Sequence, residues 1–257
     1  MLVVCNGAIK SGSTWLYNIL AELLDFSKPP ERYLTNGNQI NATIRPELLK
    51  AFLESEDFHN QNYLTKNHLG KLEHKVLLFS FRDVVVIDIL RDVRDVAVSS
   101  YYDAINRDDF RGSFEKFYWG EGRELAHAVT KYHELWKPKD RKVLRVCYEK
   151  LKDDFANEAQ KVATFLGIEL SSARVDAVRE HTSMDSLRRQ YQGEQLYQDN
   201  KFFRKGIVGD WQNHFSTSMI RDIERIERRG LRRFDPRVVL RRLRVRLGTM
   251  GWSSKGM

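Results

Sequence analysis

Hydrophobic residues in this chain follow two patterns, short continuous runs and longer segments with apolar positions three or four apart. Residues 2–8 form a short apolar run and residues 84–90 a continuous β-branched run, as is typical of buried parallel strands, and residues 142–147 predict a further buried strand. Residues 63–66 predict a further short strand. After the first run the spacing changes to that of a helix. Its apolar positions are Trp15, Leu16, Ile19, Leu20, Leu23 and Leu24.

Helical patterns alternate with these runs along the rest of the chain. They cover residues 93–105, 114–136 (one helix or two) and 155–166, and two basic helices end the chain. Residues 25–45 contain prolines, a glycine and several asparagines, and they predict a long loop. Strands that alternate with helices indicate an α/β fold with a central parallel sheet flanked by helices, a P-loop-like three-layer fold. We expect residues 1–257 to form a single domain.

The formal net charge of +8 has a local origin. Residues 225–246 hold ten arginines, no lysine and two acidic residues, so they carry the whole excess, and the body of the chain is balanced. We interpret this arginine-rich segment, about 216–250, as a solvated basic helical face rather than a site for nucleic acid or a membrane surface. No apolar run approaches the ~20 residues of a transmembrane helix, and the N-terminus lacks a secretory pattern, which predicts a cytoplasmic protein. Two cysteines, Cys5 and Cys147, predict buried free thiols.

The stretch between the first strand and the first helix has the composition of an anion-binding loop. It reads GAIKSGSTW from Gly7 to Trp15. Backbone N–H groups at the start of a helix bind anions, and hydroxyl side chains add donors. Gly7 and Gly12 have the spacing of the P-loop G-x-x-x-x-G-K-[ST], but the lysine lies earlier, at Lys10. A simple Gly/Ser turn that caps the helix is the alternative interpretation of this loop alone.

The segment KSGSTW at residues 10–15 resembles the 5′-phosphosulfate loop, K-S-G-[ST]-T-W, of sulfotransferases that use 3′-phosphoadenosine-5′-phosphosulfate (PAPS). The similarity is greatest to the cytosolic branch and suggests a compact bacterial member. The resemblance implies that this loop binds the 5′ end of PAPS and that its aromatic residue stacks on the base. The residues concerned are Lys10, Ser11, Gly12, Ser13, Thr14 and Trp15.

Two further segments resemble the parts of that family that bind the 3′-phosphate. The first, RDVRDVAVS, is similar to R-N-P-x-D-x-x-x-S and supplies Arg91 and Ser99. The second, RKGIVGDWQNHF, is similar to R-K-G-x-x-G-D-W-K-N-x-F and supplies Arg204, Lys205 and Gly206. A planar guanidinium suits a phosphate dianion, in agreement with the role that the resemblance implies.

The segment TKNHL at residues 65–69 resembles the family motif K-[ST]-H-L, in which the histidine is the general base. The resemblance implies that His68 takes the acceptor proton and that Lys66 holds the transferring group. An unperturbed histidine titrates near ~6.5, so it can accept a proton at neutral pH. Lys10 is expected to neutralise the leaving oxygen, with Ser99 restraining it until an acceptor is present.

Two shorter matches concern the adenine. Tyr148 follows the last predicted strand, and Thr182 lies in HTSM, which is similar to the family's H-T-S-F. The chain departs from the family at Asn67, Gly70 and Met184. The family's dimerisation segment after Trp211 is not reproduced, so the oligomeric state stays open.

The resemblance implies transfer of a sulfuryl group from PAPS to a hydroxyl or amine of a small-molecule acceptor, with release of 3′-phosphoadenosine-5′-phosphate (PAP). The transferred group carries one negative charge, so lysines can replace a metal, and we expect no metal requirement. The alternatives are a P-loop kinase-like phosphotransferase, a non-catalytic nucleotide-binding protein, and a nucleic-acid binder that uses the arginine-rich segment. The sequence does not identify the acceptor.

Overall fold

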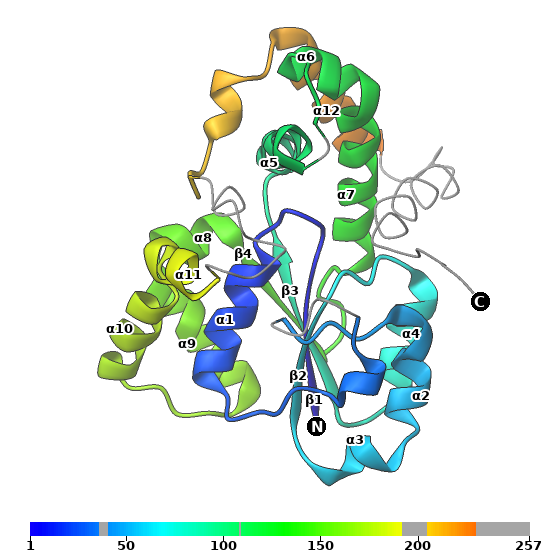
Figure 1. The fold of residues 1–257 in the computed structure, drawn as a ribbon, viewed down its shortest axis with the longest axis vertical. Coiled ribbons are helices and arrows are strands. Elements are labelled where there is room, and N and C mark those ends of the chain that lie inside the picture. The colour runs from blue at the N-terminus through cyan, green and yellow to red at the C-terminus, as the bar shows by residue number, and fades with distance from the viewer. Residues whose placement is uncertain (36–40, 108, 192–204, 230–257) are drawn as a thin grey trace, which may run out of the picture.

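A four-stranded parallel sheet forms the centre of the molecule (Figure 1). The computed structural model describes residues 1–35, 41–107, 109–191 and 205–229. The strand order is β2-β1-β3-β4, with every neighbouring pair parallel. This confirms the predicted α/β architecture. The strands are β1 (Leu2–Gly7), β2 (Tyr63–Asn67), β3 (Val84–Leu90) and β4 (Val143–Cys147).

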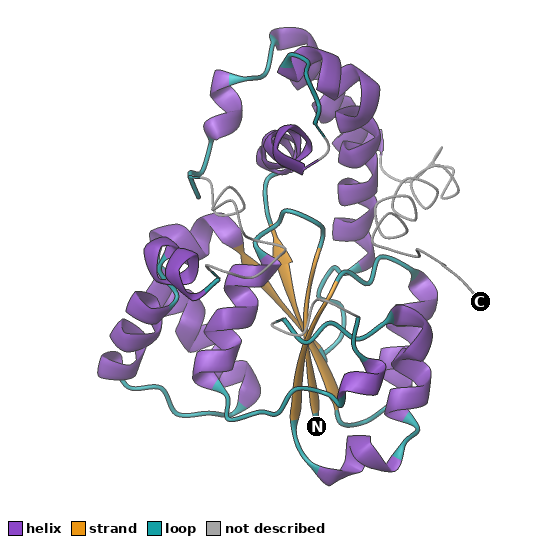
Figure 2. Ribbon diagram, viewed as in Figure 1, coloured by secondary structure: helices purple, strands orange, loops and turns teal. Residues whose placement is uncertain are grey.

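Helices lie on both sides of the sheet, as Figure 2 shows. One side carries α1, which follows β1, and the helices that follow β4. The other side carries short helices that precede and follow β2. The first group is α1 (Ser13–Leu23), α8 (Tyr148–Asp153), α9 (Phe155–Leu166), α10 (Ser172–His181) and α11 (Met184–Gln190). The second is α2 (Leu49–Leu53), α3 (Glu56–Asn60) and α4 (Leu72–Ser80), with the 3₁₀ turns η1 (Glu31–Tyr33) and η2 (Pro46–Leu48) nearby in sequence.

A third group of helices lies beyond the carboxyl ends of the strands, at the top of Figure 1. We call it the cap. It consists of α5 (Val93–Arg107), α6 (Phe114–Phe117), the π turn η3 (Tyr118–Gly122), α7 (Arg123–Leu135), the 3₁₀ turn η4 (Asp210–Asn213) and α12 (Thr217–Arg229). Ligands of open parallel sheets bind at this end of the strands. The cap therefore lies where a site is expected.

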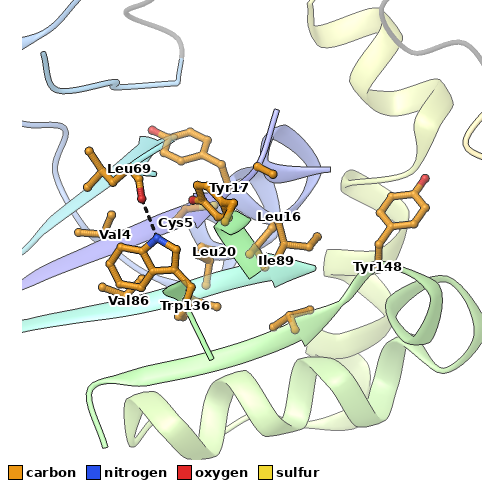
Figure 3. Packing of buried hydrophobic residues seen from close by; sticks show 14 of the residues in the cluster. Val4, Cys5, Leu16, Tyr17, Leu20, Leu69, Val86, Ile89, Trp136 and Tyr148 are labelled. Carbon is orange, nitrogen blue, oxygen red and sulfur yellow. Dashed lines mark hydrogen bonds between the residues drawn. The ribbon is translucent and has the colours of Figure 1, made fainter. Parts of the chain in front are cut away.

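The core fills both sides of the sheet, and Figure 3 shows part of it. Leu16 and Leu20 of α1 are buried on one side. On the other, Trp136 is fully buried, and its indole N–H donates to the Leu69 carbonyl at 2.6 Å. A buried indole needs such a partner, and this one anchors the chain just after β2. Cys5 is buried as expected, but Cys147 is only half-buried, and both are free thiols.

Several elements differ from the predicted ones. No sequence pattern predicted α2, α3 or α4. The helical segment 114–136 forms two helices, α6 and α7, separated by the π turn, which is one of the two arrangements expected. Strand β3 is not uniformly apolar, because it contains the fully buried Asp88. Of the arginine-rich segment, α12 is described and residues 230–250 lie outside the described part. No helix among the described residues has the length and apolar character needed to cross a bilayer.

Candidate functional site

The loop between β1 and α1 has a backbone shaped by two residues in the left-handed region. Gly12 has φ = 95°, and a Cβ there would lie 2.6 Å from the Tyr148 ring. Lys10 has φ = 62°. No side chain caps the first turn of α1, so its N–H groups face the loop, and they suit an anion. The Ser11 hydroxyl is buried and has no hydrogen-bond partner among the described residues, so it can also donate to a ligand.

Strand β2 brings the predicted lysine and histidine to this loop. Lys66 is 6% exposed, and its Nζ donates to the Thr14 hydroxyl at 3.1 Å. His68 follows β2 directly, and its Nδ1 lies 2.6 Å from the Gly7 carbonyl oxygen. Two hydrogen bonds therefore connect the β2 segment to the first loop, one at Gly7, where the loop begins, and one at Thr14, where α1 begins.

The contact with Gly7 fixes the tautomer of His68. A carbonyl oxygen can only accept, so Nδ1 must carry the proton and Nε2 holds the lone pair. His68 is exposed at the residue level, yet the protein around its ring lowers its pKa to about 4, and the positive charges of Lys66 and Lys10 act in the same direction. The imidazole is therefore neutral at pH 7 and can accept a proton at Nε2.

Arg91 connects the first loop to the glycine-rich loop that leads into η4. Its guanidinium donates to the Lys10 carbonyl at 3.1 Å and to the Ile207 carbonyl at 3.5 Å, and it lies 4.4 Å from the centre of the Tyr148 ring. Arg91 is 8% exposed, and its Nε has no partner among the described residues. A donor of this buried guanidinium is therefore available to an anion.

The glycine-rich loop approaches the same place from the cap. Gly206 has φ = 61°, and a Cβ there would lie 2.6 Å from Cε of Met184 and 3.5 Å from the Tyr148 hydroxyl. Lys205, next to it, is exposed. Asp95 of α5 accepts hydrogen bonds from the N–H groups of Gly209 at 2.8 Å and Trp211 at 3.0 Å. Arg204 lies outside the described residues.

The predicted adenine residues differ in their surroundings. Trp15 is half-buried, and its ring contacts the Tyr148 ring edge-on, with centroids 5.5 Å apart. The Thr182 hydroxyl, directly after α10, instead donates to the Val178 carbonyl of that helix at 2.7 Å. The Tyr148 ring thus lies next to Trp15, Gly12 and Arg91. The Thr182 hydroxyl is instead occupied by its hydrogen bond to α10.

Lys10 forms an ion pair with an aspartate of α5. Its Nζ lies 3.0 Å from Oδ1 of Asp103, and both side chains are largely buried, with exposed fractions of 13% and 19%. Ser99, the residue expected to restrain Lys10, lies one turn earlier on α5 and is half-buried. The two share a face of the helix because they are four residues apart.

The model of the family described as "Sulfotransferase domain" matches residues 3–235. The chain belongs to the sulfotransferase domain family. Human sulfotransferase 1E1 is 31% identical over 234 residues, which cover 82% of this sulfotransferase and 76% of the human protein. Bovine sulfotransferase 1E1 is 28% identical over 232 residues, with the same coverage.

Solved structures agree with this sulfotransferase in fold. Mouse sulfotransferase SULT7A1, complexed with PAP, matches with a TM-score of 0.68 and 21% identity over 95% of this chain and 88% of that one. Retinol dehydratase, in complex with androsterone and the inactive cofactor PAP, gives a TM-score of 0.63 and 20% identity over 92% and 83%. At these identities the comparison shows the fold alone.

The sequence did not single out every polar residue around this site. Asp103 could have been noticed from its spacing of four after Ser99 on a predicted helix. Asp95 belongs to the recognised motif, but its bonds to the glycine-rich loop depend on the tertiary structure. Asn6 accepts from the Leu69 amide at 3.0 Å, and nothing in a predicted apolar strand pointed to it.

Proposed function

We propose that this sulfotransferase binds PAPS in the loop between β1 and α1 and transfers its sulfuryl group to a hydroxyl or amine of a small-molecule acceptor, releasing PAP. The observation that supports this most directly is that two other motifs, far apart in the sequence, are joined to this loop. Lys66 bonds to Thr14, His68 to Gly7, and Arg91 to the Lys10 carbonyl. A loop that only capped a helix would have no need of these connections.

The residues present fit a nucleotide with anionic groups at two places. The uncapped start of α1, the Ser11 hydroxyl and the Lys10 side chain offer donors for a 5′-phosphosulfate. Arg91, with an unpartnered Nε, lies between this loop and the second loop, so it suits a second phosphate. We assign the 3′-phosphate to Arg91, Ser99, Lys205 and Gly206, with Arg204 added from the resemblance.

Bound PAPS supplies an activated sulfuryl group on a phosphate leaving group, and the protein's residues supply position and charge. We assign His68 Nε2 as the atom that takes the acceptor proton, because Nδ1 is committed to Gly7. Lys66, held by Thr14, provides positive charge beside the transferring group, and Lys10 provides it at the departing oxygen. No metal ion is required for these roles, so we expect single-turnover transfer to continue in excess EDTA.

The remaining assignments rest on the resemblance. Trp15, Tyr148 and Thr182 are proposed to contact the adenine, with Thr182 acting through its methyl group or backbone because its hydroxyl is engaged. Ser13 is proposed to donate to the 5′ end. A single domain over residues 1–257, a cytoplasmic location, membership of the compact bacterial branch and the lack of a nucleic-acid partner also remain proposals.

Calorimetry with PAP against ATP tests the nucleotide assignment. We expect PAP to bind at least about tenfold more tightly, because Arg91 and the second loop have no phosphate to contact in ATP. The expected affinity falls in Lys10→Met and Arg91→Met. Equal or tighter binding of ATP would favour the kinase-like alternative.

Turnover with labelled PAPS over a panel of phenols, alcohols and amines tests the catalytic assignment. His68→Ala should reduce transfer by at least about 100-fold, because the proton acceptor is removed, while PAP affinity stays within about twofold. His59→Ala is the matched control, since His59 is an exposed histidine on α3. Unchanged turnover in His68→Ala would remove His68 from this role.

A further inference from the structure

A row of polar side chains crosses the sheet beneath the catalytic histidine. Its members occupy paired positions on four adjacent parallel strands, so they point to the same face. We call this set the polar row. It consists of Asn67 on β2, Asn6 on β1, Asp88 on β3 and Arg145 on β4.

The polar row is unusual because of where it lies. Asn6 and Asp88 are 0% exposed and Asn67 is 1% exposed. Two positions earlier on the same face, β1 and β3 carry Val4 and Val86, which pack near Trp136 in Figure 3. Burying polar groups in such a core is costly unless they are hydrogen-bonded, so their presence calls for a role.

Two members of the polar row hold the segment that carries His68. Asn6 Oδ1 accepts from the Leu69 amide at 3.0 Å, and the next residue, Gly7, accepts from His68 Nδ1 at 2.6 Å. Asn67 Nδ2 donates to the Ile44 carbonyl at 2.8 Å. The backbone on either side of His68 is thus fastened by amide side chains of the polar row.

Three buried atoms around this row have no hydrogen-bond partner in the described part of the chain: Asn6 Nδ2, Asp88 Oδ1 and the Tyr132 hydroxyl. Asn6 Oδ1 is used by Leu69, so Nδ2 is a free donor. Asp88 Oδ2 is used by Arg145 at 3.1 Å, so Oδ1 is a free acceptor. Tyr132 of α7 packs beside Gly70, with 3.2 Å between its ring and a Cβ built there, which brings it close to the His68 segment.

The electrostatics agree with this proximity. Burial and the charge of Asp88 raise the pKa of Tyr132 well above its ordinary value, with the nearby Gly7 backbone N–H opposing the shift, so its hydroxyl keeps its proton. Burial raises the pKa of Asp88 to about 7, with Arg145 opposing the shift. A water molecule can donate to the carboxylate form of Asp88 or accept from its protonated form. A buried water needs two to four polar partners, and Asn6 Nδ2, Asp88 Oδ1 and the Tyr132 hydroxyl would provide three.

We propose that one internal water joins Asn6, Asp88 and Tyr132, and that Asn6 and Asp88 are positioning residues for His68. The water accepts from Asn6 Nδ2 and bonds to Asp88 Oδ1 and the Tyr132 hydroxyl. This holds the Asn6 amide so that its oxygen faces Leu69. The inference rests on the proposed role of His68 as the base, and it adds residues that contact neither nucleotide nor acceptor.

Hydrogen exchange in the PAP-bound protein tests the positioning without an identified acceptor. In Asn6→Ala we expect amide exchange in residues 67–70 to rise at least about tenfold, because the Leu69 amide loses its acceptor. PAP affinity by calorimetry should stay within about twofold. The NMR titration midpoint of His68 should also move, which a general loss of stability would not cause. Unchanged exchange and an unchanged midpoint would overturn the inference.

A pair of matched variants on α7 tests the water. Tyr132→Phe removes only the unpartnered hydroxyl and should raise exchange in residues 67–70 about threefold. Thr130→Val removes a hydroxyl that bonds to the Ala126 carbonyl within the helix, and it should change nothing there. Equal exchange in residues 67–70 for the two variants would show that the Tyr132 hydroxyl does not bind the proposed water. A crystal structure with no ordered water between Asn6 and Asp88 would overturn the bridge.

The outcomes separate this inference from the proposed function. If the wild-type protein fails to bind PAP, the proposed function fails whatever the exchange data show. If PAP binds and His68→Ala abolishes transfer while Asn6→Ala leaves exchange and titration unchanged, only the positioning role fails.

Discussion

At the scale of single residues, the charges around His68 determine the pH range in which it can act as a base. Enclosure and the charge of Lys66 lower its pKa to about 4, so the neutral form predominates above that pH. We expect kcat/KM to lose half its value near pH 4–5 on the acid side, rather than near the ~6.5 of a free histidine.

Removing the charge of Lys66 should move this midpoint upward. Lys66→Met eliminates a cation that disfavours protonation of His68, so the NMR titration midpoint of His68 should rise by about one unit. The midpoint is the readout, since the same variant also lowers the rate. Lys71→Met, an exposed lysine beyond the histidine, is the control. A midpoint that stays in place would show that Lys66 does not influence the base.

The Lys10–Asp103 ion pair leads to a prediction for nucleotide affinity. An anion that recruits Lys10 must first separate it from Asp103, and the carboxylate also repels the anion. Asp103→Asn should therefore tighten PAP binding about three- to tenfold, as measured by calorimetry. Asp109→Asn, at a surface aspartate 89% exposed, should leave affinity unchanged. Weaker PAP binding in Asp103→Asn would mean that the pair helps to shape the site.

The sequence predicted the residues that belong to contiguous motifs better than the contacts between them. Lys10, His68 and Arg91 could be located because the family motifs have fixed spacing. Asp103, the ion-pair partner of Lys10, could not be located in this way, because the pairing depends on which turn of α5 faces the loop. Asp88 was overlooked because six apolar residues surround it in β3, and only the sheet register shows that it meets Asn6 and Arg145.

At the scale of elements, Asp95 connects α5 to the glycine-rich loop through two backbone N–H groups. Asp95→Ala should release this loop and with it Lys205 and Gly206. We expect PAP affinity to fall about tenfold while the protein stays folded, because two charge-assisted hydrogen bonds are lost at one end of a loop. Asp92→Ala is the control, since Asp92 pairs with Arg94 instead. An equal loss of PAP affinity in both variants would show that removing a negative charge near the site, rather than releasing the loop, causes the effect.

The long elements were predictable and the short ones were not. Strands β1, β3 and β4 and helices α5 and α9 carry continuous or periodic apolar patterns. Helices α2 and α3 have five residues each, too few to show a period. Helix α4 exposes Leu72 and Val76, so its apolar residues do not mark a single buried face. Helices α2, α3 and α4 therefore form because the sheet and its flanking loops hold these segments in place.

At the scale of the whole molecule, the cap brings distant parts of the chain over the carboxyl ends of the strands (Figure 1). Asp222 of α12 accepts from the Tyr118 hydroxyl at 3.1 Å and from Arg123 Nε at 2.8 Å. The Asp222 side chain is 7% exposed. These bonds join α12 to η3 and α7, across about a hundred residues of sequence.

Asp222→Ala should therefore loosen the cap. It leaves a buried tyrosine hydroxyl and a half-buried arginine without their acceptor, and we expect the free energy of unfolding to fall by about 1–3 kcal/mol in urea titrations. Glu224→Ala on the same helix removes only an exposed pair with Arg228 and should cost under about 0.5 kcal/mol. Because η4 and the glycine-rich loop lie directly before α12, the Asp222 variant should also weaken PAP binding severalfold. A stability loss equal to that of the Glu224 variant would show that α12 is held by its apolar face, through Met219, Ile223 and Ile226.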